Sequence, residues 1–225
     1  MNLDLHVHTR RSHDSLAKPA QVLRADRRAG LSGIAITDHD TVRGALETRD
    51  LNDDPDFLVI PGAEYRTEIG DIIGLFITTE VASRECHRVV DEIHEQGGIV
   101  VLPHPFTGHG DVETVMEHVD LVEWFNARTR KDLNDRALEL ARRHTKPAVA
   151  GSDAHFPFEV GTCWVCVPGG DVRSALLAGR FECQARSTPA YVPMMSQMVK
   201  AAKSGNYAAL PLQALSVAKN FIVGR

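Results

Sequence analysis

Short apolar runs alternate with segments of helical periodicity through most of the chain. Each run is short enough to be a buried strand, and the segments between runs repeat apolar residues at the spacing of one helix face. Strands that alternate with helices favour a parallel sheet with crossover helices, and about seven such units would close into a distorted, TIM-like (β/α)7 barrel. Strands are expected at 3–9, 32–37, 57–61, 71–77, 99–102, 121–125 and 147–150, and helices at 19–29, 41–49, 83–96 and 131–143.

Residues that bind metal ions in proteins cluster at the C-terminal ends of these runs. Residues two apart on a strand point to the same side, so His6 and His8 can converge on one ion while Leu5 and Val7 face the packing on the other side. The carboxyl ends of parallel barrel strands meet on one face, where such barrels carry their chemistry. The sequence therefore predicts a common site that includes His6 and His8. Its other members are Asp38, His39, Glu64, His104, Asn126, Asp153 and His155.

The segment after residue 185 has a different pattern. Two amphipathic helices are expected at 191–203 and 212–223, separated by Gly205. Apolar stripes of this kind mostly face a core, and a membrane-surface role would need a rich basic face that these helices lack. We therefore expect a barrel over residues 1–185, followed by a helical extension over 186–225 that packs on the barrel or at an interface.

Composition narrows the class of protein. A chain of 225 residues with 43% hydrophobic residues is long enough to bury a full core as one unit. The net charge of -5 gives no reason to propose tight binding of duplex nucleic acid. No apolar run reaches the roughly 20 residues of a membrane span, and the N-terminus lacks a basic segment followed by an apolar one. We expect a soluble, cytoplasmic protein with no membrane partner.

The cysteines do not form a recognisable metal or redox site. Four cysteines are too few for a disulfide scaffold and fit a reducing compartment. Cys163 and Cys166 have the spacing of a zinc knuckle, but they lie in a strand-like run at 162–167, which would place their sulfurs on opposite faces. We therefore expect no role for this pair.

Five motifs occur in a fixed order along the chain. They are H-x-H-x5-D (His6, His8, Asp14), T-D-H-D (37–40), G-A-E (Glu64), L-P-H-P (His104) and G-S-D-A-H (Asp153, His155). Together they resemble the motifs of the PHP family, the polymerase and histidinol phosphatase superfamily of metal-dependent phosphoesterases. The resemblance spans roughly residues 1 to 185, and it implies a distorted seven-stranded barrel that holds two or three divalent ions.

The resemblance also implies how the ligands are shared. One ion would be held by His6, His8, Glu64 and Asp153. Glu64 would bridge to a second ion that His104 also binds, and a third would be held by Asp14, His39 and His155. Many relatives have a histidine after the glutamate motif, in a His-Ile-Leu-Gly type of sequence. Here the matching stretch begins with Asp71, whose carboxylate would take that ligand's place.

The ligand set can also be judged by its chemistry. Imidazole and carboxylate ligands without thiolate suit Mn, Fe or Zn. Adjacent ions would bind a bridging water, lower its pKa toward neutrality and hold the phosphate oxygens in line for attack. The nucleophile would then be a metal-bridging hydroxide, and no Gly-x-Ser-x-Gly nucleophile turn is present in the sequence.

Further residues are predicted to orient the ligands or to bind the substrate. Asp38 beside His39 is predicted to orient a ligand or accept a proton, and a helix cap is the competing interpretation. Arg11, Lys18 and Arg128 lie beside strand ends and could clamp substrate phosphate, although surface Arg and Lys are mostly solvated. Asn126 is expected to line the pocket.

Two more histidines lie close to the motifs. His13 is expected to point elsewhere if its neighbour Asp14 binds metal. His109 follows His104 in a Gly-rich loop and could reach substrate.

Three functions remain open from the sequence. The first is hydrolysis of a phosphate monoester of a small metabolite or nucleotide, because the short loops leave little room for a large substrate. The second is a phosphodiesterase or exonuclease acting on short nucleic acid, against which the 6% aromatic content and the acidic balance argue mildly. The third is a non-catalytic PHP-like module that binds a partner through its C-terminal helices. The sequence does not indicate an oligomeric state.

Overall fold

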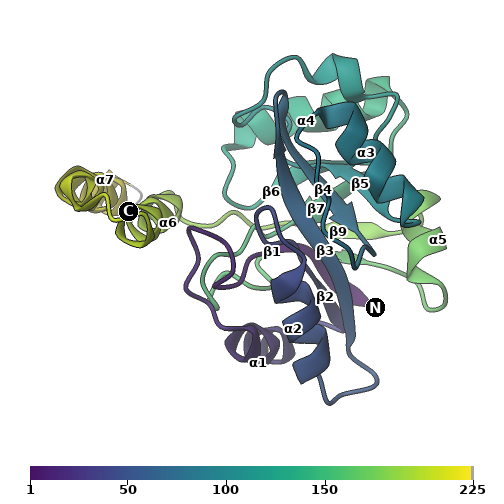
Figure 1. The fold of residues 1–225 in the computed structure, drawn as a ribbon, viewed down its shortest axis with the longest axis horizontal. Helices are drawn as coiled ribbons and strands as arrows, with labels where there is room; N and C mark the ends of the chain where they lie inside the picture. Colours follow the sequence, from purple (N-terminus) through teal and green to yellow (C-terminus); the bar gives the residue numbers. More distant parts are fainter. Residues whose placement is uncertain (224–225) are drawn as a thin grey trace.

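One nine-stranded sheet forms the centre of the computed structural model, which describes residues 1–223 (Figure 1). Its strands lie next to one another in the order β7-β6-β5-β4-β3-β2-β1-β8-β9. In chain order they are β1 (Asn2–Val7), β2 (Gly33–Ile36), β3 (Leu58–Thr67), β4 (Gly70–Leu75), β5 (Ile99–Leu102), β6 (Leu121–Asn126), β7 (Ala148–Gly151), β8 (Trp164–Cys166) and β9 (Glu182–Gln184).

The sheet curls until the segment after β7 meets the end of β1. Val7 and Ala154 form a parallel bridge, and the backbone N–H of His8 donates to the carbonyl of Ala154 at 2.8 Å. The N–H of Ala154 donates in turn to the carbonyl of His6 at 3.3 Å. The result is a nearly closed α/β barrel, which confirms the predicted fold class.

The sequence analysis predicted a parallel sheet, but some of the strands are antiparallel. β4 runs antiparallel to both β3 and β5, and β8 runs antiparallel to β1 and β9. Only Glu68 and Ile69 separate β3 from β4, and a parallel connection would need a crossover of a dozen or more residues. β3 is also longer than the predicted strand, so that Glu64 lies within it rather than after it.

Helices cover the outside of the barrel close to where periodicity predicted them. These are α1 (Pro19–Ala29), α2 (Arg43–Leu51), α3 (Cys86–Glu95) and α4 (Lys131–Arg143). α1 has proline at its first position and ends at Gly30, whose φ of 73° suits a residue without a side chain. The sequence did not predict α5 (Val172–Leu177), β9 or the short 3-10 turns η1 (Val112–Val115) and η2 (Tyr207–Ala209).

The hydrophobic core has an inner and an outer part. Side chains from eight strands fill the barrel interior, among them Leu3, Ala35, Ile60, Ile73, Ile99, Leu121, Val149 and Val165. Separate clusters pack under α1 and α2 and under α3 and α4. Cys163 is buried in a further small cluster, whereas Cys166 is exposed, which confirms that the two sulfurs lie on opposite faces.

β1 is irregular where it carries the first two histidines. Its register against β2 shifts between Asp4 and Val7. As a consequence, Leu5 packs into the barrel interior while Val7 packs in the outer cluster under α1. The expectation that Leu5 and Val7 share one face was therefore wrong, because a bulge breaks the simple alternation of a strand.

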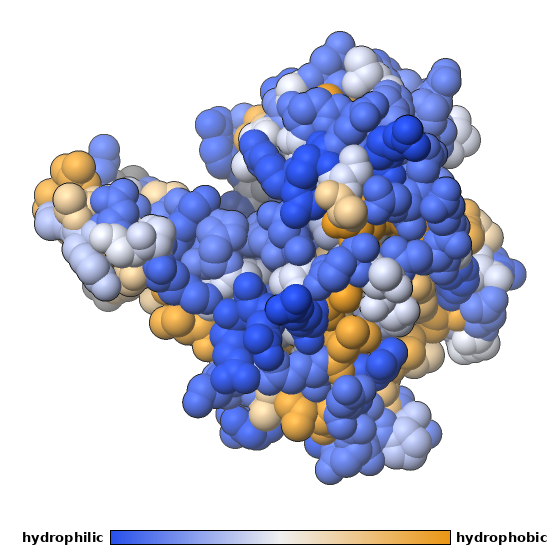
Figure 2. All heavy atoms as spheres, in the orientation of Figure 1, coloured by the Kyte–Doolittle hydropathy of each residue, from blue (hydrophilic) through white to orange (hydrophobic). Residues whose placement is uncertain are grey.

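The two C-terminal helices form a pair at one end of the molecule (Figure 1). α6 (Tyr191–Lys203) buries Val192, Ser196 and Ala201. α7 (Leu210–Val223) packs on α6 and leaves Leu212 exposed by 73% and Leu215 by 67%, and apolar side chains show on this pair in Figure 2. Within residues 1–223 no helix has the length and apolar character needed to cross a membrane.

Candidate metal centre

The side chains of the five motifs converge at one end of the barrel. β1 carries His6 and its end carries His8, and Glu64 lies in β3. The others follow strands or lie in the loop after β1, and all are wholly or largely buried; they are Asp14, His39, His104, Asp153 and His155. Ring centroids lie 5.8 Å apart for His6 and His104 and 4.2 Å apart for His8 and His155.

His6 and His8 present nitrogen atoms to each other across 3.1 Å. His6 Nδ1 lies 2.9 Å from Glu123 Oε1, and because a carboxylate only accepts, this nitrogen carries a proton. Ser12 Oγ donates to Asp38, so it accepts from His8 Nδ1 at 2.9 Å. With Nδ1 of each ring donating in this way, each Nε2 can present a lone pair, and a proton or a metal cation fits between the two.

The pKa shifts of His6 and His8 also reflect how strongly this point of the cluster favours a cation. Burial lowers the pKa of His6, but Glu123, Asp153 and Glu64 outweigh it and raise that pKa well above its usual range. Burial lowers the pKa of His8 to about 3, assisted by His155 and His39. The carboxylates that favour a proton on His6 equally favour a metal cation at this point.

Glu64 is the centre of the cluster. Its Oε2 lies 3.4 Å from His8 Nε2 and 3.1 Å from His39 Nδ1, and its Oε1 lies 3.1 Å from His104 Nε2. Burial alone would raise the pKa of Glu64, but the imidazoles, led by His39 and His6, lower it well below the usual range. Glu64 is therefore a carboxylate placed between two groups of histidines.

A second group of ligand atoms surrounds Asp14. Its Oδ2 lies 3.1 Å from His155 Nε2 and 3.4 Å from His39 Nε2. Its Oδ1 is buried and has no hydrogen-bond partner. Burial raises the pKa of Asp14, but hydrogen bonds from His155 and His39 more than offset this and lower it.

The spacing of these atoms fits divalent cations. Metal–ligand bonds of roughly 2.0–2.2 Å place neighbouring ligand atoms about 3 Å apart. His8 Nε2 lies 3.3 Å from Asp153 Oδ1 and His6 Nε2 lies 3.5 Å from Glu64 Oε2, which match that spacing. Among residues 1–223, five sets of three ligand atoms lie within 4.8 Å of one another: His6, His8 and Glu64; His8, His39 and His155; His6, His104 and Asp153; His13, Asp14 and His39; and Glu64, Asp71 and His104.

Glu123 in β6 was missed by the sequence analysis. It is 2% exposed, and its Oε2 accepts from the backbone N–H of His104 at 3.0 Å and from Asn126 Nδ2 at 3.0 Å. Together with its bond to His6, this carboxylate orients two histidines of the cluster. The available signal was a single charged residue inside an otherwise apolar strand.

Asp38 orients the loop that carries the ligands. Its carboxylate accepts from the backbone N–H and hydroxyl of Thr9 at 2.7 and 2.6 Å, and from those of Ser12 at 3.1 and 2.7 Å. It is linked to the ring of His8 only through Ser12, whereas the sequence analysis had placed it in direct contact with a ligating histidine. It is fully buried and does not line the cavity.

Asp71 lies at the edge of the cluster. One of its ligand atoms lies within 4.8 Å of those of Glu64 and His104, and its Oδ2 pairs with Arg66 Nη1 at 3.0 Å. His109 does not reach the cavity, because its Nε2 accepts from the backbone N–H of Asp71 at 3.1 Å and its Nδ1 donates to Thr107.

The predicted substrate-binding residues separate into two groups. Arg128 lines the cavity, and its side chain is 8% exposed. Arg11 does not, because both its Nε and its Nη2 bind Glu47 on the surface of α2, at 3.1 and 2.8 Å. Lys18 is exposed at the start of α1. Asn126 is buried and holds Asp153 Oδ2 at 3.2 Å rather than lining the cavity.

His13 corrects another expectation. Its ring centroid lies 4.6 Å from that of His39, and its Nε2 lies 3.8 Å from Asp14 Oδ2. It therefore points toward the second ligand group rather than away from it, although its side chain is 47% exposed.

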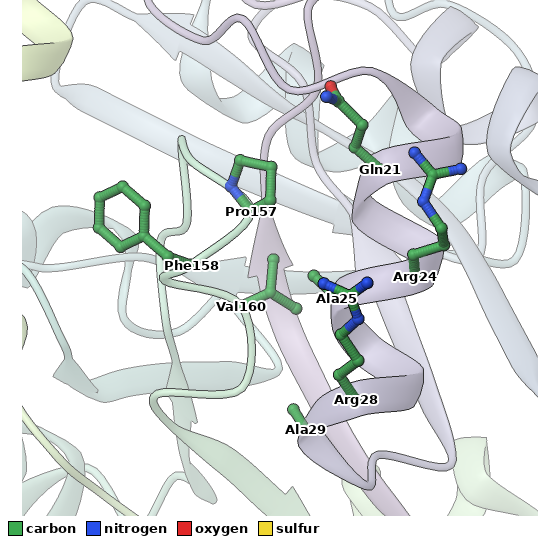
Figure 3. Close-up of a pocket in the computed structure, with 8 residues that line it drawn as sticks. All are labelled: Gln21, Arg24, Ala25, Arg28, Ala29, Pro157, Phe158 and Val160. Atoms are coloured by element: carbon green, nitrogen blue, oxygen red, sulfur yellow. The ribbon is translucent and has the colours of Figure 1, made fainter.

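The converging side chains line a cavity of about 220 Å³. Thr107, Thr129 and three residues of α6 complete its wall. A larger groove of about 660 Å³ lies elsewhere, between α1 and the segment after His155, and Figure 3 shows Arg24, Arg28 and Phe158 around it. None of the residues that line the groove belongs to the metal-ligating sets, so the chemistry belongs to the smaller cavity.

Two family models match the chain. The PHP domain matches residues 4–102, and a PHP-associated family matches residues 131–181. The first match spans His6, Asp14, His39 and Glu64, and α6 and α7 lie outside both.

Known proteins resemble the chain in sequence and in fold. MJ1587 and MJ0417, uncharacterised proteins of Methanocaldococcus jannaschii, are 34% and 33% identical to it, over 58% and 73% of the chain and 84% and 70% of their own lengths. A two-domain protein of Bacteroides vulgatus, containing a predicted PHP-like metal-dependent phosphoesterase, has a TM-score of 0.70 at 18% identity. The match covers 83% of this chain and 65% of that one, so this chain spans less than two thirds of its length. An amidohydrolase of Chromobacterium violaceum has a TM-score of 0.60 at 17% identity, over 81% of this chain and 98% of its own.

Proposed function

The chain belongs to the PHP domain family, and we propose that it is a metal-dependent phosphoesterase that hydrolyses phosphate monoesters of small metabolites or nucleotides. The observation that carries the proposal is the convergence of imidazole and carboxylate groups around one buried carboxylate, Glu64, in a cavity that an arginine also lines. This donor set suits Mn, Fe or Zn. Two or three divalent ions would be held by His6, His8, Asp14, His39, Glu64, Asp71, His104, Asp153 and His155.

Ions held there would activate solvent as the nucleophile and offset the charge of the phosphate. The protein's own contribution is orientation and exclusion of water. Glu123 and Asp38 fix the rings of His6 and His8, the latter through Ser12, so that each Nε2 faces the carboxylates of Glu64 and Asp153. Arg128 supplies a guanidinium on the cavity wall that can donate to phosphate oxygens.

The size of the cavity supports a monoester of a small alcohol. About 220 Å³ has room for a phosphate group and a compact alcohol, and α6 closes one side of it. A phosphodiester within a nucleic-acid strand would need space for the chain on both sides of the phosphate. The proposal therefore favours a terminal phosphate as the reacting group.

The test is release of inorganic phosphate. Purified protein is freed of metal, loaded with Mn²⁺ and incubated with a panel of sugar, polyol, amino-alcohol and nucleotide monophosphates. We expect release from at least one monoester, and loss of at least 100-fold in rate for His6→Ala. Release from none of them, by protein that elemental analysis shows to be loaded, would refute the proposal.

The groove between α1 and the segment after His155 favours a second candidate. Arg24 and Arg28 are exposed there without an acidic partner among residues 1–223, and Phe158 is 63% exposed and stacked on Phe156 at 5.4 Å. Cations beside aromatic rings suit single-stranded nucleic acid, so the candidate is an exonuclease. Degradation of a labelled oligonucleotide that Arg24→Ala with Arg28→Ala slows tenfold would support it, and equal rates would not.

A further inference from the structure

α6 forms part of the wall of the reaction cavity, although it lies outside both family matches. Pro193, Ser196 and Gln197 line the cavity opposite the converging ligands. Ser196 is 1% exposed, whereas Gln197 is exposed and makes no hydrogen bond to any residue within 1–223. A free carboxamide therefore faces the space above the ligand cluster.

Arg128 ties this helix to the ligand cluster. Its Nη2 donates to Ser196 Oγ at 2.6 Å and to the carbonyl of Val192 at 3.4 Å. Its Nη1 binds His155 Nδ1, and its Nε lies 3.4 Å from Glu159 Oε1. One guanidinium thus joins α6 to a predicted metal ligand.

Lys203 makes a second attachment at the other end of the helix. Its Nζ donates to the carbonyls of Arg10, Ser12 and Ser15 at 2.9, 2.6 and 3.0 Å. All three ammonium protons are satisfied, and all three acceptors belong to the loop that carries Asp14. α6 is held by this loop at one end and by Arg128 at the other.

The opposite side of α6 packs against α7. Tyr191 meets Phe221 edge-on with ring centroids 5.3 Å apart. The polar side of α6 therefore faces the cavity while the apolar side is covered by its neighbour, so the helix is a fixed wall.

We propose that α6 determines which substrates the enzyme accepts, with Gln197 as the residue that contacts the alcohol part of the ester. This proposal rests on the proposed phosphatase function. A phosphate on the ligand cluster directs the remainder of the substrate toward α6, where the carboxamide can donate to and accept from hydroxyl groups. The substrate class is then a compact monoester whose alcohol carries hydroxyl groups, and bulky aryl esters are excluded by the wall.

The test compares glycerol 1-phosphate with p-nitrophenyl phosphate, as probes of a compact polyol ester and a bulky aryl ester. For Gln197→Ala we expect KM for glycerol 1-phosphate to rise about 5- to 10-fold, the value of one hydrogen bond, with a smaller change in kcat. The ratio of kcat/KM between the two esters should shift at least fivefold toward the aryl ester. A smaller shift, or a shift toward the polyol ester, would overturn the proposal.

Two further variants distinguish an effect of α6 on substrate choice from a general loss of structure. Lys203→Met removes an attachment of α6, so amide hydrogen exchange in residues 191–203 should speed up and the ester ratio should shift in the same direction. Lys219→Met on α7, where the lysine makes no hydrogen bond or ion pair within residues 1–223, should leave both unchanged. Equal exchange in the Lys203 and Lys219 variants would contradict the attachment.

Failure of this inference can be told apart from failure of the proposed function. If the wild-type protein releases no phosphate, the function fails, and calorimetric binding of glycerol 1-phosphate to Mn²⁺-loaded protein becomes the test of α6. If Gln197→Ala weakens this binding at least fivefold, the proposed contact between α6 and the substrate is supported. Equal binding by both proteins, or no binding by the wild type, overturns it.

Discussion

At the scale of single residues, the candidate site depends on which nitrogen of each histidine carries the proton. Glu123 accepts a hydrogen bond from Nδ1 of His6, and Ser12 accepts one from Nδ1 of His8. Both Nε2 atoms are thereby left to bind a cation, and partners of this kind raise ligand basicity as well as orienting the ring. Residues that never contact the ion therefore control its affinity.

We predict that Glu123→Gln weakens Mn²⁺ binding by about 10- to 100-fold, the usual cost of losing such a partner. The measurement is titration calorimetry on metal-free protein. Glu117→Gln is the matched control, because Glu117 is exposed and makes no hydrogen bond or ion pair within residues 1–223. Equal affinities for the two variants would show that Glu123 does not act on the site.

Asp26 in α1 gives a prediction about stability. It is fully buried, both carboxylate oxygens lack partners, and burial, with Asp4 adding to it, raises its pKa well above the usual range. The unfolded chain ionises Asp26 at its ordinary pKa, whereas the folded protein resists ionisation. The wild type should therefore lose stability, relative to Asp26→Asn, as pH rises above the unfolded pKa.

Asp26→Asn should stabilise the protein by about 1–3 kcal/mol at pH 7, and the difference should shrink as pH falls to 4, because ionisation of Asp26 then favours the unfolded chain much less. Urea unfolding of the two proteins at both pH values measures this. A variant that is less stable at pH 7, or a difference that does not change with pH, would contradict the account.

At the scale of elements, close approach between a helix and a loop sets the position of Asp38. α2 packs so near this loop that a Cβ on Gly44 would lie 1.8 Å from Asp38 Oδ2 and 2.5 Å from Thr9 Oγ1. Asp38 holds Thr9 and Ser12, and Ser12 holds His8. A packing contact on the outside of the barrel is thus connected to the ligand cluster.

Gly44→Ala should destabilise the protein by about 1–3 kcal/mol, because overpacking forces the helix or the loop to move. Gly169→Ala is the control, since a Cβ there would have nothing within 4 Å. Denaturant unfolding of both variants tests this, and a Gly44 variant as stable as the Gly169 variant would count against it.

The elements were predictable where periodicity alone determines them. The helices at 131–143 and 191–203 and the strand at 99–102 have the predicted bounds. The β3–β4 hairpin was not foreseen, because an apolar run does not reveal the direction of its strand. Most motif residues were found because each is a metal-binding type at the end of a predicted strand, whereas Asp14, in the loop after β1, was found through the resemblance to the PHP family. Glu123 was missed because its role depends on a contact with His6, 117 positions away in sequence.

At the scale of the whole molecule, the cluster ties together strands from across the barrel. Its side chains come from widely separated strands of the curled sheet, with Asp153 after the edge strand β7, His6 in β1, and Glu64 in β3 between them. A cation bound by all three would bind only the folded chain. Metal should therefore stabilise the entire barrel by mass action.

We predict that Mn²⁺ at 100 times its Kd stabilises the metal-free protein by about 2.7 kcal/mol for one site, and by more if further sites fill. Thermal unfolding with Mn²⁺ and with EDTA measures the shift in Tm. Asp153→Asn should lose most of the shift. An equal shift in this variant would mean that the ion binds elsewhere.

Anomalous diffraction from crystals soaked in Mn²⁺ locates each ion independently of any activity. We expect a peak about 2.0–2.4 Å from the Nε2 atoms of His6 and His8, and at least one more beside Glu64 toward His39 or His104. A fully soaked crystal with no anomalous peak within bonding distance of His6, His8 and Glu64 would contradict the proposed metal centre.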